Sequence, residues 1–177
     1  MLDNVAEKKK KIKVLVIDVD GTLTDGKLYI GATGELFKRF DVKDGSGIHD
    51  ILPLYSILPV VVTGRSSEIV VKRCDELEIS HVYQGCRDKE NTVEMVAQNF
   101  GFLKHDNKYD EIAYIGDDLI DLGGMRLSGI SGCPSDSALE VKRSVDFICN
   151  KKGGEGAVRE FIEWLVHNGL NSGEKNE

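Results

Sequence analysis

Residues 14–26 read VLVIDVDGTLTDG. The apolar run Val14–Ile17 has the length and β-branched composition of a buried strand, and it leads directly into Asp18 and Asp20. Acidic side chains crowded at the end of a strand repel one another unless a cation lies between them. Asp, Gly and Thr also form ordinary turns, so this stretch alone leaves both a turn and a catalytic site open.

Further apolar runs bounded by turns recur along the chain, and amphipathic helical patterns lie between them. The predicted strands are residues 14–17, 59–62, 81–83, 112–115 and 147–149, and the predicted helices are residues 48–55, 66–77, 88–100 and 157–167. Strands that alternate with helices favour an α/β fold with a doubly wound, Rossmann-like and mainly parallel sheet. A β-hairpin, with its turn at residues 31–34, is inserted after the first strand, and no cap domain follows.

The 177 residues, 41% hydrophobic and 30% charged, fit one domain. We expect a flexible N-terminal extension over residues 1–11, a single domain over residues 12–170 and a disordered tail over residues 171–177. The net charge of -7 argues against nucleic acid as a partner. No apolar stretch approaches the length of a membrane span, so we expect a soluble, cytoplasmic protein without a membrane partner. The four cysteines lack the spacing of zinc ligands.

A second acidic cluster follows the strand predicted at residues 112–115. It consists of Asp117, Asp118 and Asp121, after Gly116. Because the carboxyl ends of neighbouring parallel strands meet at one edge of a sheet, we expect the two clusters to converge there. Carboxylate oxygens are the hard ligands that Mg²⁺ prefers, whereas helix capping explains one of these carboxylates but hardly three.

Two more strand ends carry groups that suit a phosphate. Residues 60–62 lead into Thr63, Gly64 and Arg65, which offer a hydroxyl, backbone N–H groups and a guanidinium. Lys89 stands at the start of the helix that follows residues 81–83, where its charge and the helix dipole both attract an anion. The sequence therefore predicts an anion site beside a metal site.

Taken in chain order, these elements resemble the four motifs of the haloacid dehalogenase superfamily. The missing cap domain, the hairpin and the stretches 18–26, 40–48 (FDVKDGSGI) and 153–160 (GGEGAVRE) resemble more closely its family of 3-deoxy-D-manno-octulosonate 8-phosphate (KDO 8-phosphate) phosphatases. The resemblance covers about residues 12–167. It implies a Mg²⁺-dependent phosphatase that hydrolyses the phosphate monoester of an acidic sugar phosphate.

The resemblance also implies roles for individual residues. Asp18 would attack phosphorus and form an aspartyl-phosphate, while Asp20 would protonate the leaving sugar oxygen and then deprotonate the hydrolytic water. Thr63 and Lys89 would stabilise charge on the phosphoryl oxygens. The implied ligands of Mg²⁺ are oxygen atoms of Asp18, Asp20 (its backbone carbonyl) and Asp117, with Asp118 and Asp121 as weaker or supporting ligands.

For the sugar, the resemblance implies a further set of contacts. The implied substrate-binding residues are Asp41, Lys43, Asp44, His49, Arg65, Arg73, Lys89 and Arg159. His49 stands where an arginine is expected for KDO 8-phosphate, so a sialic acid (Neu5Ac or KDN) 9-phosphate is the alternative substrate. Arg65 is less typical of the enzymes for deaminated sugars, which favours KDO 8-phosphate.

An uncapped active site needs shielding from water, and the resemblance implies a homotetramer with the C-terminal tail at a neighbouring active site. We expect the glycine-rich segment 151–160 to act as the lid. A non-catalytic, oligomerising module of the same fold is the alternative of another class, but Asp18, Asp20 and Lys89 are all present. A response-regulator receiver is disfavoured because the third predicted strand ends in Gln84 and Gly85, without a phosphate acceptor.

Overall fold

A parallel sheet of six strands forms the centre of the protein in a computed structural model, which describes residues 8, 9 and 11–167. The strands lie in the order β5-β4-β1-β6-β7-β8. They are β1 (Val14–Ile17), β4 (Leu58–Val62), β5 (His81–Tyr83), β6 (Tyr109–Ile115), β7 (Ser128–Cys133) and β8 (Phe147–Ile148). After β1, the chain adds β4 and then β5 on one side of that strand. It then returns to add β6, β7 and β8 on the other side, so the predicted doubly wound sheet is confirmed.

Strand β7 is absent from the prediction because its sequence, SGISGC, contains no apolar run. All six of its residues are nevertheless buried. A Cβ on Gly132 would overlap the ring of Phe161 in helix α7 (Ala157–His167). The small residues of β7 therefore allow α7 to pack close against the sheet.

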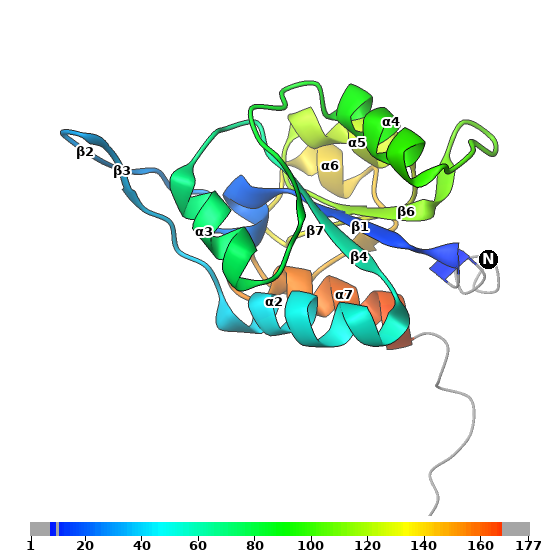
Figure 1. Ribbon diagram of the computed structural model, residues 1–177, viewed down its shortest axis with the longest axis horizontal. Coiled ribbons are helices and arrows are strands. Elements are labelled where there is room, and N and C mark those ends of the chain that lie inside the picture. The colour runs from blue at the N-terminus through cyan, green and yellow to red at the C-terminus, as the bar shows by residue number, and fades with distance from the viewer. Residues whose placement is uncertain (1–7, 10, 168–177) are drawn as a thin grey trace, which may run out of the picture.

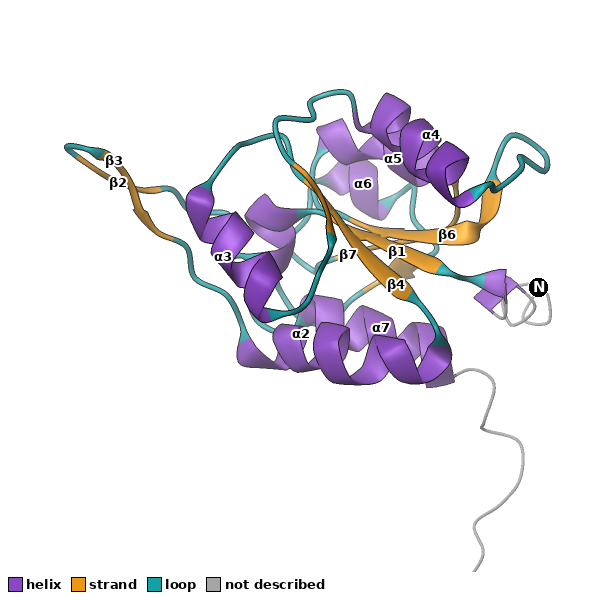
Figure 2. Cartoon of the chain, viewed as in Figure 1, coloured by secondary structure: helices purple, strands orange, loops and turns teal. Residues whose placement is uncertain are grey.

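Two hydrophobic layers cover the two faces of the sheet. Leu15 and Ile17 pack towards α3 (Glu68–Glu76) and α7, whereas Val14 and Val16 pack towards three other helices. These are α4 (Lys89–Phe100), α5 (Leu122–Leu127) and α6 (Leu139–Lys142). Figures 1 and 2 show the two groups of helices on opposite sides of the strands. Successive residues of a strand point to opposite faces, so the run VLVI contributes to both layers.

The helices predicted at residues 88–100 and 157–167 are confirmed. Asp88 caps α4 by accepting a hydrogen bond from the Asn91 N–H at 3.0 Å, and Gly101 ends the helix in the left-handed region with φ 70°. The helix expected at residues 48–55 forms as two consecutive helical segments, Gly47–Ile51 and Leu52–Tyr55, with helical backbone at their junction. Pro53, which lacks an N–H, stands in the first turn of the second segment, where the hydrogen-bond pattern changes.

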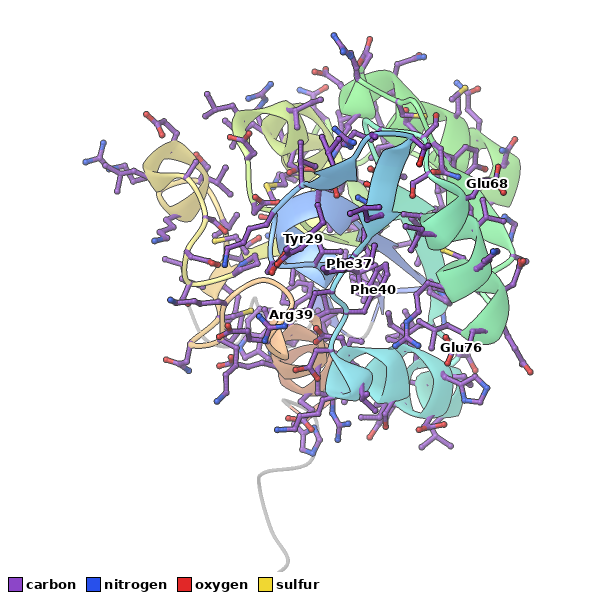
Figure 3. The ribbon with its side chains drawn as sticks, turned by 90° about the vertical axis from the view of Figure 1, so that its left-hand side faces the viewer. Tyr29, Phe37, Arg39, Phe40, Glu68 and Glu76 are labelled. Atoms are coloured by element: carbon purple, nitrogen blue, oxygen red, sulfur yellow. The ribbon has the colours of Figure 1, made fainter. Side chains whose placement is uncertain are left out.

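The predicted hairpin consists of β2 (Tyr29–Gly31) and β3 (Gly34–Phe37), and it projects from the molecule beyond the carboxyl end of β1 (Figure 1). The rings of Tyr29 and Phe37 stack across it with centroids 4.2 Å apart (Figure 3). Its exposed apolar side chains are Leu28, Ile30, Leu36 and Phe37. In the described part of the chain, this hairpin is the insertion between β1 and α2 (Val42–Ser46), and no cap domain is present.

Two lysines of the predicted N-terminal extension contact the domain. The Lys11 ammonium donates a hydrogen bond of 2.9 Å to Oδ2 of Asp110. The Lys9 ammonium lies 3.3 Å from the centroid of the Trp164 ring and donates a hydrogen bond of 2.6 Å to the Trp164 carbonyl. Lys9 is therefore buried, although it belongs to the predicted flexible extension. Most of that extension (residues 1–7 and 10) and the predicted tail 171–177 lie outside the described residues. No helix among the described residues is long and apolar enough to cross a bilayer.

Candidate active site

The register of the sheet brings the predicted motif residues to one edge. Ile17, the last residue of β1, pairs with Val61 of β4 and with Ile115 of β6. The loops after these strands therefore meet at the carboxyl edge, where doubly wound sheets bind ligands. A cavity at this edge is lined by Asp18, Asp20, Thr63, Gly64, Arg65, Arg87, Lys89, Asp118, Ile120 and Asp121.

Three carboxylates converge at this edge of the sheet, and two of them, Asp18 and Asp121, line the cavity. Oxygen atoms of Asp18, Asp117 and Asp121 all lie within 4.8 Å of one another. The Lys89 ammonium lies 2.5 Å from Oδ1 of Asp18 and 2.5 Å from Oδ1 of Asp121, and all three of these side chains are buried. One ammonium offsets only part of the charge of three carboxylates, so the remaining negative charge and the hard oxygen donors fit a divalent cation such as Mg²⁺.

The protonation equilibria of these groups reflect that crowding. Burial, together with the charge of Asp121, raises the pKa of Asp18 well above its usual value, and Lys89 acts in the opposite direction. Burial and Asp121 likewise raise the pKa of Asp117 to about 6. Although burial opposes it, the charges of Asp18 and Asp121 raise the pKa of Lys89, which remains an ammonium at neutral pH. The repulsion between the carboxylates is the physical reason that the site favours a metal ion.

Gly21 and Thr22 join the first acidic loop to the second. The Thr22 hydroxyl donates a hydrogen bond of 3.0 Å to Oδ1 of Asp117. Gly21 has φ 98°, and a Cβ at this position would overlap the Asp117 carboxylate. The glycine of the DVDGT stretch is therefore required both by its backbone conformation and by the close approach of Asp117.

Asp121 holds the second acidic loop together. Its Oδ1 accepts from Lys89 and, at 2.8 Å, from the Tyr114 hydroxyl, while its Oδ2 accepts the N–H groups of Asp117 and Asp118 at 3.1 Å each. Asp118 is exposed, and its side chain caps the turn that begins at Leu119 with a hydrogen bond of 2.8 Å. Both oxygens of Asp121 are thus engaged by protein donors, which suits a supporting role beside the metal site more than direct ligation.

Lys89 and Thr63 enter the site from the two neighbouring strand ends. Lys89 is the first residue of α4, so its buried side chain reaches the carboxylates from the amino end of that helix. Thr63 is buried after β4, where its N–H donates to the Tyr83 carbonyl at 2.9 Å and its carbonyl accepts from the Cys86 N–H at 2.9 Å. These bonds fix the loop that carries Thr63, Gly64 and Arg65 at the cavity.

Of the residues implied for the sugar, Arg65 and Lys89 line this cavity. The others are engaged elsewhere in the described chain. Asp41 caps α2, and Asp44 caps α7. Lys43 and Arg159 line a separate cavity, where Arg159 pairs with Glu163. His49 contacts Asp50 and Glu78, and Arg73 pairs with Glu76. Arg73 also lies over the ring of Phe40, with 5.7 Å between its guanidinium carbon and the ring centroid. Figure 3 labels Phe40 and Glu76, the two residues that Arg73 contacts here.

The expected lid segment packs against its own chain. Gly153 and Gly154 are buried beneath the loop after β1, where the Gly154 N–H donates to the Thr22 carbonyl at 3.1 Å. A Cβ on Gly153 would overlap the Gly21 carbonyl. In this position the segment supports the first acidic loop, and closing over the cavity would require it to leave these contacts.

Three charged residues of the site escape the sequence-based prediction. Lys38 and Glu35 come from the hairpin, where Lys38 forms an ion pair with Asp20. Arg87 lines the cavity, is exposed, and forms no ion pair or hydrogen bond with any residue that the structure describes. The position of Arg87, two residues before Lys89 and after a strand's carboxyl end, is the sequence signal that could have placed it at this edge of the sheet.

Sequence and structure comparisons give consistent relatives, although no family model matches the sequence. The KDO 8-phosphate phosphatase KdsC of Escherichia coli (strain K12) is 36% identical over 163 residues, which are 92% of this chain and 84% of the relative. A hydrolase described as putative haloacid dehalogenase (HAD) superfamily, subfamily III A, from Legionella pneumophila superposes with a TM-score of 0.86 at 35% identity, covering 94% of this chain and 88% of the other. The KDO 8-phosphate phosphatase of Moraxella catarrhalis, solved with a magnesium ion, a phosphate ion and a KDO molecule, gives a TM-score of 0.86 at 35% identity and covers 95% and 93%.

The fold and the two acidic loops define a haloacid dehalogenase-type phosphoric monoester hydrolase, and residues 11–167 contain no cap domain. The acidic cluster and the magnesium-bound relative together indicate Mg²⁺ as its cofactor. The chain belongs to the KDO 8-phosphate phosphatase family of that superfamily.

Proposed function

We propose that this protein hydrolyses KDO 8-phosphate to KDO and inorganic phosphate with Mg²⁺ as its cofactor. The observation that carries the proposal is the Lys89 ammonium between the carboxylates of Asp18 and Asp121, at the ligand-binding edge of a chain from this family. The KDO molecule and the phosphate ion held by the Moraxella catarrhalis relative correspond to the two products of this reaction.

Asp18 is the proposed nucleophile. One of its oxygens forms a bond to phosphorus while the bond between phosphorus and the sugar oxygen breaks, which gives an aspartyl-phosphate. Lys89 orients the Asp18 carboxylate, and Lys89 and Thr63 take up charge on the phosphoryl oxygens. When bound by oxygens of Asp18, Asp117 and the Asp20 backbone, Mg²⁺ supplies positive charge that offsets the repulsion between carboxylates and phosphate.

Asp20 is the proposed general acid and base. It gives a proton to the leaving sugar oxygen, and it later takes a proton from the water that attacks the aspartyl-phosphate and releases phosphate and free Asp18. Its side chain lines the cavity and is 21% exposed, so it is open both to a substrate in the cavity and to solvent. A sugar alkoxide is a poor leaving group without this proton.

Arg65 and Arg87 are the proposed partners of the sugar carboxylate. Both line the cavity that holds Asp18, and a guanidinium pairs with a carboxylate through two parallel hydrogen bonds. The Arg65 guanidinium is only loosely engaged, with Nε 3.7 Å from Oδ2 of Asp20 and Nη2 3.7 Å from Oε1 of Glu35. It can therefore turn towards a substrate without losing a close hydrogen bond.

We further propose that residues 12–170 form one phosphatase domain, which assembles into a homotetramer with the C-terminal tail at a neighbouring active site. The exposed apolar side chains of the hairpin support assembly. The position of Arg159 and Arg73 outside the chain's own cavity supports a role at a neighbouring subunit's site. Light scattering would give the subunit count, and mixing inactive Asp18→Asn with Arg159→Ala subunits should restore activity only if Arg159 serves a neighbour.

The test of the substrate is phosphate release by the full chain, with Mg²⁺ and with EDTA, from three esters. These are KDO 8-phosphate, Neu5Ac 9-phosphate and KDN 9-phosphate. We expect kcat/KM for KDO 8-phosphate to exceed the others by about 10-fold or more, with no turnover in EDTA. A preference for either nine-carbon ester would replace KDO 8-phosphate by that substrate, and inactivity on all three would favour a non-catalytic module.

A further inference from the structure

The hairpin contacts Asp20, which lines the catalytic cavity, through Lys38, the residue that follows β3. The side chain of Lys38 is 1% exposed, and its ammonium forms an ion pair with Oδ1 of Asp20. On its other side it lies 3.0 Å from Oε1 of Glu35 in β3. A buried lysine between two carboxylates is costly to desolvate, and losing its partners would leave an uncompensated buried charge. Lys38 is thus a fixed link between the hairpin and Asp20.

Glu35 is itself held against the body of the domain. The Ser67 hydroxyl donates to Oε2 of Glu35, and Ser67 is the residue that caps α3. Although partial burial acts against it, the hydrogen bonds from Ser67 and Lys38 keep the pKa of Glu35 below its usual value. Glu35 is therefore a carboxylate at neutral pH, and it connects Lys38 to the start of a helix rather than to a mobile side chain.

This chain of contacts leaves the two oxygens of Asp20 in different surroundings. Lys38 occupies Oδ1, whereas Oδ2 lies 3.7 Å from Nε of Arg65, a residue that lines the cavity. A carboxyl group held on one oxygen cannot rotate freely, so the other oxygen keeps a constant direction. Proton transfer requires such a direction, because donor and acceptor atoms must lie within about 2.6–3.2 Å of each other.

We propose that Lys38, backed by Glu35, is a positioning residue that presents Oδ2 of Asp20 to the leaving group. The proposal rests on the proposed function in one respect, namely that Asp20 is the general acid. It assigns the hairpin a part in the chemistry, because the residue that orients the acid belongs to the hairpin and not to the four motifs.

The test compares two aryl phosphates whose leaving groups differ in their need for a proton. Phenolate is strongly basic and leaves with protonation, whereas p-nitrophenolate leaves unaided. We expect Lys38→Met to lower kcat on phenyl phosphate about 10-fold to 100-fold more than on p-nitrophenyl phosphate, with KM changed by less than about 3-fold. Lys38→Arg, which keeps the charge, should recover most of the loss, and Glu35→Gln should show a smaller loss in the same direction.

Lys27→Met is the matched control, because Lys27 is an exposed lysine at the entry to the hairpin and does not line the cavity. It should leave both rates unchanged. Asp20→Asn gives the full effect of losing the general acid, and no Lys38 variant should exceed it.

Two results would overturn the positioning role. Equal losses on both aryl phosphates, accompanied by a lower melting temperature, would mean that Lys38 only stabilises the fold. No loss on either would mean that Asp20 needs no orientation. If the wild-type chain hydrolyses aryl phosphates but not KDO 8-phosphate, the proposed substrate is contradicted. The comparison of Lys38 variants on the two aryl phosphates remains valid in that case. Inactivity on every ester would contradict both proposals.

Discussion

The Thr22 hydroxyl donates a hydrogen bond of 3.0 Å to Oδ1 of Asp117, a residue 95 positions later in the chain. This bond joins the loop after β1 to the loop after β6. Gly21 allows the close approach, since any side chain there would overlap the Asp117 carboxylate. The loop that carries the proposed nucleophile and the loop that carries the second acidic cluster therefore form one unit.

Asp18→Asn should abolish turnover while it leaves the fold intact. An amide is no nucleophile towards phosphorus, so kcat on any phosphate ester should fall by about 10³-fold or more. Circular dichroism and thermal unfolding would show whether the variant folds. Activity within about tenfold of the wild type would contradict the role of Asp18.

Mg²⁺ should raise the melting temperature of the protein. A ligand at about 100 times its Kd stabilises the folded state by about 2.7 kcal/mol, which is several degrees for a chain of this size. Asp117→Asn should lose most of this increment, yet melt higher than the wild type in EDTA because one repelling carboxylate is gone. Asp75→Asn, on the exposed side of α3, is the control and should respond to Mg²⁺ like the wild type. An unchanged Mg²⁺ response in Asp117→Asn would place the metal elsewhere.

Arg87→Ala should raise KM for an acidic sugar phosphate by about 10-fold and change KM for p-nitrophenyl phosphate by less than about 2-fold. Only the sugar has a carboxylate for the guanidinium to pair with. Arg143→Ala removes an exposed arginine that does not line this cavity, and it serves as the control. If KM rises equally for both esters, Arg87 contacts the phosphate instead of the carboxylate.

Asp44 should make the stability of the protein depend on pH. Burial raises the pKa of Asp44 from 3.8 to about 6 in the folded state, which corresponds to about 3 kcal/mol. Because the folded pKa is the higher one, this contribution to stability is complete below about pH 4 and is lost as the pH rises through about 6.

The matched variant is Asp44→Asn, whose carboxamide oxygen can still accept the Arg159 N–H but does not titrate. Urea unfolding at about pH 4 and about pH 7.5 should show the wild type losing up to about 3 kcal/mol relative to the variant as the pH rises. A difference that stays constant between the two pH values would show that Asp44 is not the titrating group.

Much of the sheet and the floor of the site could be predicted because both depend on local sequence. An apolar run such as VLVI is a strand in almost any surroundings, and acidic residues directly after it must stand at the sheet edge. Strand β7 could not be predicted, because its glycines and serines form no apolar run and are buried by segments distant in the sequence. Gly132 lies against Phe161 of α7, and Gly129 lies against the backbone of Asp110 in β6.

The remaining site residues depend on contacts between distant segments. Lys38 is 18 positions from Asp20, and its charge alone gives no sign that it is buried. Asp44, implied as a substrate residue, accepts the Arg159 N–H 115 positions later and so caps α7. Neither spacing nor composition reports such a cap, because its donor belongs to another part of the sequence.

The hairpin carries both the exposed side chains of Leu36 and Phe37 and, one residue beyond β3, the ammonium that holds Asp20. Because Lys38 is proposed to position Asp20, a ligand that buries those apolar side chains should also change the orientation of the Asp20 carboxyl group. The two equilibria are then coupled. An antibody fragment raised against the hairpin tip would then act as an allosteric effector. It would change the turnover of esters with basic leaving groups, although its footprint never touches the reacting phosphate.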